Sequence, residues 1–358
     1  MKICYFADGE SIHVIRWCRH FASLGHEVHL ISFKKVSIEN VTMHFIDTGA
    51  ISVEGGNWKV ILKLREVKKI LWKIKPDIFH SLYATSYGLV GALCNYHPYV
   101  LTALGSDVLV SPKNSFLYKK ILQFVFKRAD WITAMADHMR EKILELGASS
   151  SKTETVIFGI DTSIFNLEYR KLNDSKFIIT STRNLEPVYN LPHLIEAVAK
   201  ARNQIPNLFL NIIGSGTLRN ELEYLVKRKN MGDIVKFFGK TSQEELVQTL
   251  KSSHVFISTS LSDGNNISLN EAMACGNVCI ATDIPANRQW IKNSENGFLV
   301  PINDIDGLSE KILAAYQHYN DLSSRFTPLN EKIISERADW KKNMESVEKK
   351  YLSLINKK

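Results

Sequence analysis

The 358-residue sequence lacks the features that mark membrane-spanning, disulfide-rich and zinc-binding proteins. No stretch approaches the roughly 18 uninterrupted apolar residues that a membrane-spanning helix needs. The five cysteines are odd in number and contain no Cys-x-x-Cys pair, which argues against a disulfide framework or a zinc site and favours a reducing compartment. The N-terminus reaches acidic residues too early for a signal peptide. We therefore expect a soluble cytoplasmic protein.

Internal repeats and low-complexity segments are also missing, and 45% hydrophobic with 23% charged residues is ordinary globular composition. What is present is an alternation of short β-rich runs with longer helical patterns. It begins with Lys2 to Phe6, Ile12 to Leu24 and Glu27 to Phe33, and it restarts after Phe165. This alternation predicts an α/β fold of βαβ units with parallel sheets.

A polar stretch, Asn166 to Ser175, separates the two halves of this pattern. We predict a first domain over residues 1–168, a second over 174–335, and a C-terminal helix over 336–358 that packs back toward the first domain. Both domains are expected to be doubly wound, with a cleft between them. Ligands of such sheets bind beyond the carboxyl ends of the strands, so the loops that follow strands are the first candidates for a site.

The segment from Ser258 to Gly276 is the most informative of these loops, because a buried-looking strand runs into a small polar loop and then into an apolar helix. Unpaired amides and the dipole at such a helix start favour a phosphate. Glu271 lies eight residues after Asp263, too far into the helix to cap it, where its carboxylate can accept hydrogen bonds from vicinal hydroxyls. The alternative is an ordinary helix start with Asp263 as a local cap.

The spacing Asp263-x7-Glu271, followed by Ala-Met-Ala-Cys-Gly, resembles the carboxylate motif of retaining GT-B-fold glycosyltransferases of family 4. Seven further blocks resemble that family in the expected order: Leu24 to Val28, Pro76 to His80, Gly105 to Asp107, Ala129 to Thr133, Phe158 to Phe165, Arg183 within Ser181 to Leu185, and Gly214 to Gly216. The resemblance covers nearly the whole chain. It implies the GT-B fold, in which two Rossmann-like domains face each other across a cleft.

For function, the resemblance implies transfer of a hexose or N-acetylhexosamine from a nucleotide-diphosphate donor, with retention at the anomeric carbon. A UDP-sugar is preferred over a GDP-sugar, and the acceptor is a glycan or lipid-linked molecule in cell-surface polysaccharide or glycolipid synthesis. No cofactor and no metal are expected, because helix N-termini and cationic side chains hold the diphosphate. Negative charge develops on the leaving group, so catalysis is mainly electrostatic stabilisation.

The donor site implied by the resemblance is centred on three catalytic candidates of the second domain. Arg183 would clamp the phosphates, since its guanidinium offers paired donors, although a surface arginine at a strand end is the alternative. Glu271 would bind the ribose, and Asp263, shorter than the family's usual Glu, would grip the donor sugar. Further donor-binding candidates are Gly9, Ser11, Gly214, Gly216, Gly264, Asn265, Asn266, Ile267, Tyr189 and Lys240.

Two of these candidates compete for one role. The family often has a second phosphate-binding lysine about six residues after the arginine, and here Tyr189 lies near that place. Lys240 is a possible replacement or a solvated loop lysine.

In the first domain, Gly9 and Ser11 belong to a loop that replaces the family's usual paired glycines. This loop aims backbone amides at the cleft, or else Ser11 is simply the N-cap of the helix that follows.

On the acceptor side, His80 is the fourth catalytic candidate. The family has a His-x-His-Tyr cluster near the transferred sugar, whereas this sequence has Leu82 in place of the second histidine, and His80 can equally be a core residue. Asp107 would contact the acceptor hydroxyl or stabilise its own loop. The remaining acceptor-side candidates are His13, Arg16, Tyr83 and Ser106.

The basic excess lies mainly in the first half, with 21 basic against 16 acidic residues up to position 170 and 24 against 21 beyond it. Trp58 to Lys75 contains seven cations and one acid, and Phe116 to Arg128 is a second basic and apolar stretch. These stretches suit docking on anionic lipid at the inner face of the cell membrane; the alternative is a solvated helix face. No basic-aromatic nucleic-acid module is visible.

Two other functions share the features above. A nucleotide-sugar 2-epimerase with the GT-B fold would convert the donor without an acceptor. A non-catalytic GT-B protein would bind a nucleotide sugar or stabilise a partner enzyme, and the missing lysine and second histidine are compatible with that alternative.

Overall fold

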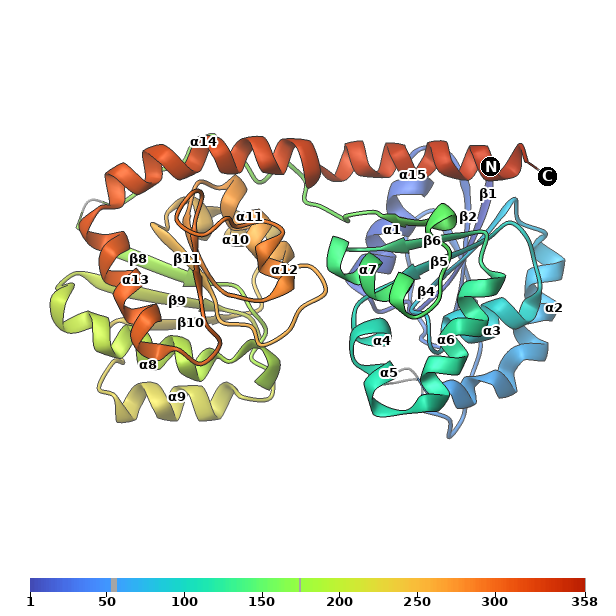
Figure 1. The fold of residues 1–358 in the computed structure, drawn as a ribbon, viewed down its shortest axis with the longest axis horizontal. Coiled ribbons are helices and arrows are strands. Elements are labelled where there is room, and N and C mark those ends of the chain that lie inside the picture. Colours follow the sequence, from blue (N-terminus) through green and yellow to red (C-terminus); the bar gives the residue numbers. More distant parts are fainter. Residues whose placement is uncertain (53–56, 174, 358) are drawn as a thin grey trace. The chain divides into compact units, whose positions relative to one another are not determined.

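The computed structural model describes residues 1–52, 57–173 and 175–357. Its contacts divide the chain into two compact units. The first unit comprises Met1–Ile157 together with the residues from Met344 onward, and the second comprises Phe158–Asn343. Each unit is a parallel sheet flanked by helices (Figure 1), which confirms the predicted α/β class.

The first unit has a seven-stranded sheet in the order β3-β2-β1-β4-β5-β6-β7, with every pair parallel. Its strands are β1 (Lys2–Phe6), β2 (Glu27–Ser32), β3 (Val41–Phe45), β4 (Ile78–Leu82), β5 (Tyr99–Ala103), β6 (Trp131–Ala134) and β7 (Thr153–Thr155). Its helices are α1 (Ile12–Ser23), the 3-10 helix η2 (Trp58–Lys63), α2 (Leu64–Ile74), α3 (Tyr87–Cys94), α4 (Ser106–Leu109), α5 (Ser111–Asn114), α6 (Phe116–Arg128) and α7 (Asp137–Glu145). The strand order reverses direction between β1 and β4.

The C-terminal helix α15 (Trp340–Ile355) supplies part of the core of the first unit. Tyr351 is fully buried, and its ring lies 5.4 Å from that of Phe21 and 6.1 Å from that of Trp131, measured between centroids. Its hydroxyl and the ring of His80 are hydrogen-bonded at 2.6 Å. Burial of one large aromatic side chain is worth roughly 1.5–3 kcal/mol, so this helix is an integral part of the unit.

The second unit has a six-stranded parallel sheet in the order β10-β9-β8-β11-β12-β13, which reverses between β8 and β11. Its strands are β8 (Phe177–Ser181), β9 (Leu208–Ile213), β10 (Val235–Gly239), β11 (Val255–Ser258), β12 (Val278–Thr282) and β13 (Phe298–Val300). Its helices are α8 (Leu191–Ala201), α9 (Arg219–Arg228), α10 (Gln243–Lys251), α11 (Ile267–Ala274), α12 (Pro285–Arg288), α13 (Ile305–Gln317) and α14 (Tyr319–Arg337). Helix α8 packs against α9 and α13, and α11 packs against α14.

The boundary between the units lies at Ile157, earlier than the predicted residue 168. The reason is that Ile160 is hydrogen-bonded to the C-terminal part of the second unit. The Ile160 N–H donates to the Ala338 carbonyl at 2.8 Å, and the Trp340 N–H donates to the Ile160 carbonyl at 2.9 Å. Residue 174, the predicted start of the second domain, lies outside the described residues. Among the helices that the structure describes, none has both the length and the apolar character to cross a bilayer.

Candidate active site

The polar candidates of the second domain gather where its sheet reverses direction. Strands β8 and β11 are neighbours, and Arg183 follows β8 by two residues while Asp263 follows β11 by five. Parallel strands end at the same edge of the sheet, so the two loops meet there. This reversal is the place where open α/β sheets bind ligands.

Arg183 is buried in this cluster, with 7% of its surface exposed. Its Nη2 donates to Asp263 Oδ2 at 2.5 Å, and its Nη1 donates to Asn266 Oδ1 at 2.8 Å. Its guanidinium lies over the Tyr189 ring, 4.2 Å from the centroid, which is a cation–π contact. The Nε atom is buried and has no acceptor among the described residues. The guanidinium is therefore fixed by three neighbours, while its buried Nε–H remains available for a ligand, as expected of a ligand-binding arginine.

Asn266 connects Arg183 to the start of helix α11. Its Oδ1 accepts from the Leu269 N–H at 3.1 Å as a helix cap, and its Nδ2 donates to Ser258 Oγ at 3.1 Å and to Asn287 Oδ1 at 2.9 Å. Every hydrogen-bonding position of this fully buried amide is thus in use. Asn266 supports the site from within the protein, and it, not Asp263, caps the helix.

The backbone before α11 presents unpaired donors. Within the part of the chain that the structure describes, the N–H groups of Gly264, Asn265 and Asn266 donate to no acceptor. The Ile267 N–H, which we expected to be available, donates to the Asn265 carbonyl at 3.0 Å. Three unpaired amides at the positive end of an eight-residue helix, beside a guanidinium, form a site suited to an anion.

Asn287 and Trp290 are supporting residues that the sequence analysis missed. Asn287 holds Asn266, and Trp290 Nε1 donates to Asn265 Oδ1 at 2.9 Å. Their position after β12 is the feature of the sequence that could have indicated them, because loops that follow neighbouring parallel strands contact one another at this edge of the sheet. The Nδ2 of Asn265 is buried without a partner among the described residues, so this side chain also retains a donor.

Gly214 and Gly216, both predicted to bind the donor, lie against the loop that carries Arg183. A Cβ atom on Gly214 would lie 2.6 Å from the Arg183 carbonyl oxygen, and one on Gly216 would collide with the Leu185 carbonyl oxygen. Gly214 also has φ +140°, which glycine adopts readily. The structure therefore gives both glycines a positioning role for Arg183, and direct contact with the donor stays a prediction.

The remaining candidates of the second domain differ in their relation to this cluster. Tyr189 is half-buried and belongs to it through its contact with Arg183. Glu271 is half-buried in the second turn of α11. Lys240 is exposed just after β10, and no hydrogen bond or ion pair from it to the cluster is found among the described residues. Tyr189, not Lys240, thus neighbours the arginine.

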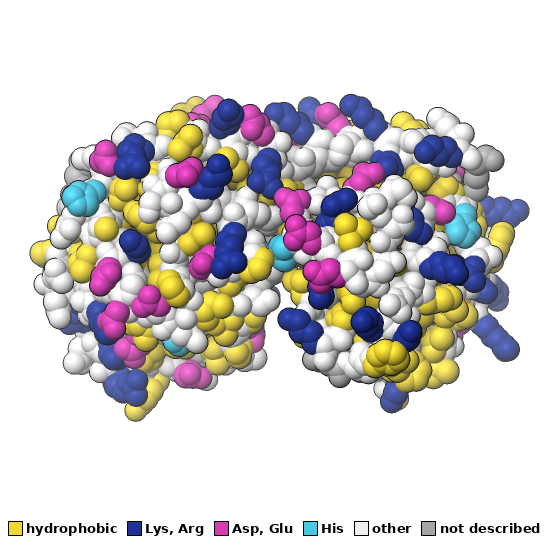
Figure 2. Space-filling model, viewed as in Figure 1, with side chains coloured by type: hydrophobic (Ala, Val, Ile, Leu, Met, Phe, Trp, Pro, Cys, Tyr) yellow, Lys and Arg dark blue, Asp and Glu magenta, His cyan; other side chains and the backbone are white. Residues whose placement is uncertain are grey.

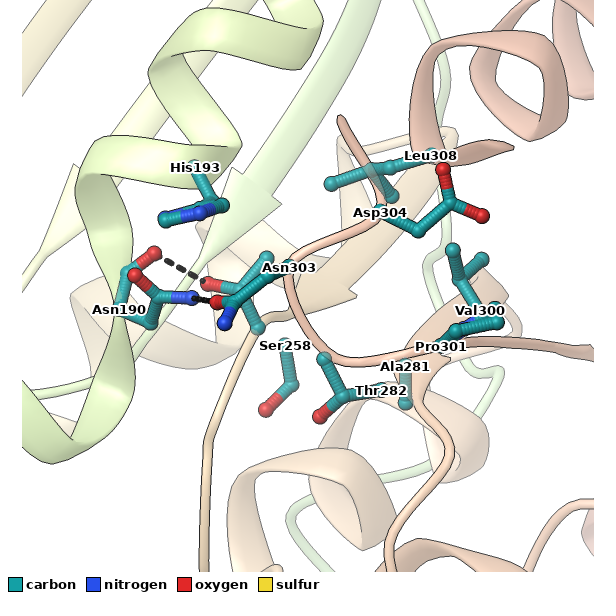
Figure 3. A pocket seen from close by; sticks show the side chains of 11 residues that line it. Asn190, His193, Ser258, Ala281, Thr282, Val300, Pro301, Asn303, Asp304 and Leu308 are labelled. Atoms are coloured by element: carbon teal, nitrogen blue, oxygen red, sulfur yellow. Dashed lines mark hydrogen bonds between the residues drawn. The ribbon is translucent and has the colours of Figure 1, made fainter. Parts of the chain in front are cut away.

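A small pocket lies next to the cluster, under the loops that follow β11, β12 and β13 (Figure 3). Asn190 Nδ2 donates to Asn303 Oδ1 across its edge at 3.1 Å, and Ser258 joins its lining to the Asn266 network. The space accommodates about one water molecule, far less than a nucleoside. This pocket is therefore too small to hold the donor by itself. Within the described ranges, no three His, Cys, Asp or Glu side chains gather as metal ligands.

In the first unit, the structure corrects the acceptor role predicted for Asp107. The residue is fully buried, and its carboxylate accepts the N–H groups of Ala84 at 2.7 Å, Gly105 at 2.8 Å and Leu104 at 3.2 Å. Burial raises the pKa of this carboxyl, and the backbone donors oppose that shift. Both oxygens are occupied, so Asp107 stabilises its own loop.

His80 also needs a correction, because it lies within β4 and is fully buried. Its Nδ1 is hydrogen-bonded to the Tyr351 hydroxyl at 2.6 Å and its Nε2 to Thr102 Oγ1 at 2.7 Å. Burial lowers the pKa of the imidazole to about 3, so the ring is neutral near pH 7. These contacts identify His80 as a core residue and remove the basis for a catalytic role.

Gly9 and Ser11 are placed at the reversal point of the first sheet, after β1. The Gly9 N–H donates to Ser32 Oγ at 2.9 Å, so that amide is not aimed outward. Ser11 occupies the N-cap of α1, although its side chain makes no capping hydrogen bond. His13 and Arg16 lie one turn apart on α1 and are half-buried.

Tyr83 and Ser106 are brought together by the ends of β4 and β5. Their hydroxyl oxygens are 3.0 Å apart, and Tyr83 has φ +87°, an unusual conformation for a residue with a side chain. Backbone outliers of this kind cluster at functional sites, so this pair is the acceptor-side candidate that the geometry favours.

Together, the fold and the site define a protein of two Rossmann-like units whose second unit carries an anion-binding cluster at its topological reversal. Residues 165–332 match the family model described as glycosyl transferases group 1, and residues 2–136 match the model described as glycosyl transferase 4-like. The chain belongs to these family-4-type, group 1 glycosyltransferases, and its fold is GT-B.

Similar proteins span most of the chain. N-acetyl-alpha-D-glucosaminyl L-malate synthase of Bacillus anthracis is 23% identical over 313 residues, 82% of this chain and 81% of that protein. An Escherichia coli UDP-Gal:alpha-D-GlcNAc-diphosphoundecaprenol alpha-1,3-galactosyltransferase is 28% identical over 269 residues, 69% of this chain and 68% of that protein.

Solved structures show the same fold over the full length. A sucrose-phosphate synthase from Thermosynechococcus elongatus matches with a TM-score of 0.85 at 17% identity, covering 100% of both chains. Anabaena HepE in complex with UDP matches with a TM-score of 0.78 at 16% identity, covering 99% of this chain and 100% of that chain.

Proposed function

We propose that the protein is a retaining, metal-independent glycosyltransferase that moves a hexose or N-acetylhexosamine from a UDP-sugar to a glycan or lipid-linked acceptor. The reaction would serve cell-surface polysaccharide or glycolipid synthesis on the cytoplasmic side of the membrane. The observation that carries this proposal is the buried Arg183 beside three unpaired amides at the start of α11. Such donors stabilise the charge that develops on a departing diphosphate.

The names of similar proteins support the choice of donor and acceptor. The Escherichia coli relative uses UDP-Gal and a diphosphoundecaprenol-linked acceptor by its name, and the HepE structure holds UDP. Uridine is therefore the base that we propose, and a lipid diphosphate-linked sugar is the acceptor class to test first.

A screen of nucleotide sugars tests this function. Thermal unfolding is measured with UDP, GDP and their sugar derivatives at one concentration, and a UDP-sugar should raise Tm because binding stabilises by RT ln(1 + [L]/Kd). The selected donor is then incubated with lipid-linked acceptors, and proton NMR should show a new glycosidic bond with the donor's anomeric configuration. A converted sugar nucleotide without acceptor use would indicate the epimerase, and the absence of any nucleotide binding would contradict the proposal.

The ribose role proposed for Glu271 has its own test. The wild-type protein should bind UDP about 10-fold more tightly than 2′-deoxy-UDP, because a carboxylate gains a charge-assisted hydrogen bond from each hydroxyl. The substitution Glu271→Ala should remove that preference. Glu244→Ala, at an exposed position on α10, is the matched control and should retain it. Retention of the preference in the Glu271 variant would refute the assignment.

We propose that membrane association uses an exposed apolar and basic surface of the first unit. Val110, Phe116 and Leu117, between α4 and the start of α6, are 45%, 71% and 49% exposed. No acidic residue occurs from position 108 to 129, whereas this stretch has five cations: Lys113, Lys119, Lys120, Lys127 and Arg128. Figure 2 shows dark-blue and yellow side chains side by side where Figure 1 labels α5 and α6. Exposed apolar groups among unopposed cations suit an anionic lipid surface.

Vesicle co-sedimentation tests this surface. Reversing the charges of Lys119 and Lys120 to Glu should reduce binding to phosphatidylglycerol vesicles by 10-fold or more, since each cation contributes about 1 kcal/mol near an anionic surface. The same reversal at the exposed Lys227 and Lys332 of the second unit is the control and should have little effect. Equal losses in both variants, or binding without preference for anionic lipid, would contradict the proposal.

A further inference from the structure

The cation expected to hold the diphosphate already has an anionic partner in the protein. Asp263 Oδ2 lies 2.5 Å from Arg183 Nη2, and the pair is shielded from solvent, with 8% of the arginine and 15% of the aspartate side chain exposed. Attraction between opposite charges is strong in such surroundings, and removal of one member leaves the other charge uncompensated. A diphosphate that reaches Arg183 must therefore compete with a carboxylate that is already in place.

The surroundings of Arg183 leave the aspartate as the exchangeable partner. Asn266 is tied to three other groups besides Arg183, and Tyr189 lies under the face of the guanidinium. Asp263, by contrast, is in the loop between β11 and α11, five residues after the strand. Among the described residues its carboxylate has a single hydrogen-bonding partner, Arg183. Replacement of Asp263 by a phosphate would preserve every other contact of the guanidinium.

We propose that Asp263 is an exchangeable counter-ion of Arg183, displaced by the donor diphosphate and then free to accept hydrogen bonds from hydroxyls of the donor sugar. This inference rests on the proposed function. Exchange makes the full donor a better ligand than the bare nucleoside diphosphate, because only the sugar offers Asp263 new partners. After transfer, the carboxylate returns to Arg183 and favours release of the nucleotide product. Asp263 is then a specificity-determining residue as well as a sugar contact.

Calorimetric titration with UDP and with the UDP-sugar selected by the screen tests the exchange. In Asp263→Asn the competing charge is gone, so UDP should bind about 10-fold more tightly than to the wild type. The Kd for UDP divided by the Kd for the UDP-sugar should fall by a similar factor. The matched control is Asp283→Asn, which breaks an exposed Asp–Arg pair of the same 2.5 Å length in the same unit. That control should leave both affinities unchanged.

The opposite role for Asp263 predicts the opposite sign. If the carboxylate held Arg183 in its binding orientation, Asp263→Asn would weaken UDP binding, and that result, or an unchanged affinity, would overturn the exchange. A wild-type measurement does not depend on the variant folding. UDP carries up to one more negative charge than a UDP-sugar, through the second ionisation of its terminal phosphate near pH 6. The wild type should nevertheless bind the UDP-sugar at least as tightly, and a 10-fold preference for UDP would refute the inference.

The same titrations separate this inference from the proposed function. Binding of no nucleotide by the wild type would contradict the function itself. Binding of a UDP-sugar by the wild type, with no gain for UDP in Asp263→Asn, would refute the exchange and leave the function intact.

Discussion

The two units have the same kind of sheet but use the polar residues at its carboxyl edge in different ways. In the first unit, Asp107 receives three backbone N–H groups and the Gly9 N–H is donated to Ser32. In the second unit, Arg183 is bonded to side chains only and retains a buried Nε without an acceptor in the described ranges. A place at the carboxyl edge of a strand is thus not enough for function. Groups satisfied by nearby backbone shape a loop, whereas groups held by other side chains can exchange partners.

The largest effect should come from the second unit. Arg183→Ala should lower the transfer rate by about 10²–10³, the loss typical of removing one transition-state donor. Arg183→Lys retains the charge but not the forked guanidinium, so its transfer rate should lie between those of the wild type and Arg183→Ala. The control is Arg288→Ala, which removes an arginine bonded twice to Asp283 at the surface. Nucleotide release with acceptor present gives the rates, and an active Arg183→Ala protein would break the contrast between the units.

A smaller effect, on stability, is expected in the first unit. Asp107→Ala leaves two buried N–H groups and one part-buried N–H group without their acceptor, so the free energy of unfolding should fall by about 3 kcal/mol, while UDP affinity stays unchanged. Urea denaturation measures the first quantity and calorimetry the second. Asp47→Ala is a matched control, since this exposed aspartate accepts a single backbone N–H, from Gly49. Its free energy of unfolding should fall by about 1 kcal/mol or less. Full stability with lost transfer would restore Asp107 as an acceptor contact.

The smallest effect is a pH dependence from His80. Burial lowers the pKa of the folded imidazole to about 3, whereas in the unfolded chain it is near 6.5, so between these values only the unfolded chain binds the proton. Stability should therefore fall as the pH decreases through this window, by up to about 1.4 kcal/mol per pH unit.

Urea titrations at pH 7, 6 and 5 measure this slope. His80→Gln should flatten it, because glutamine does not titrate. His318→Gln is the control, since that ring is exposed at the surface. An identical slope in wild type and His80→Gln would show that the buried imidazole is not the source.

Much of the fold could be predicted because its signals are local. Alternating apolar runs and helical patterns predicted most strands of both sheets. One strand that these patterns did not predict is β13, Phe298–Val300, whose three residues between Gly297 and Pro301 are too short to show a period. Its pairing with β12 is what makes it a strand, and pairing is not visible in a local pattern.

The site was predictable where a motif carried it and not where partners come from distant segments. The family resemblance placed Arg183, Asp263 and Glu271 in one unit, and the rule that ligands bind at loops following parallel strands pointed to Arg183 and Asp263. His80 was misassigned because β4 is buried along its whole length, so the strand pattern does not separate core from edge. Its partner Tyr351 is 271 residues away, beyond any local signal.

The return of the C-terminal residues to the first unit bears on how the chain is made. Helix α15, which buries Met344, Val347 and Tyr351, completes a core whose remaining members precede residue 158, so the first unit emerges from the ribosome without one of its own helices. Residues 158–343 are synthesised in between, which takes roughly 10–40 s at the usual rate of about 5–20 residues per second. During that interval His80 and its aromatic neighbours lack their cover. The first unit can therefore complete its core only after the last helix docks.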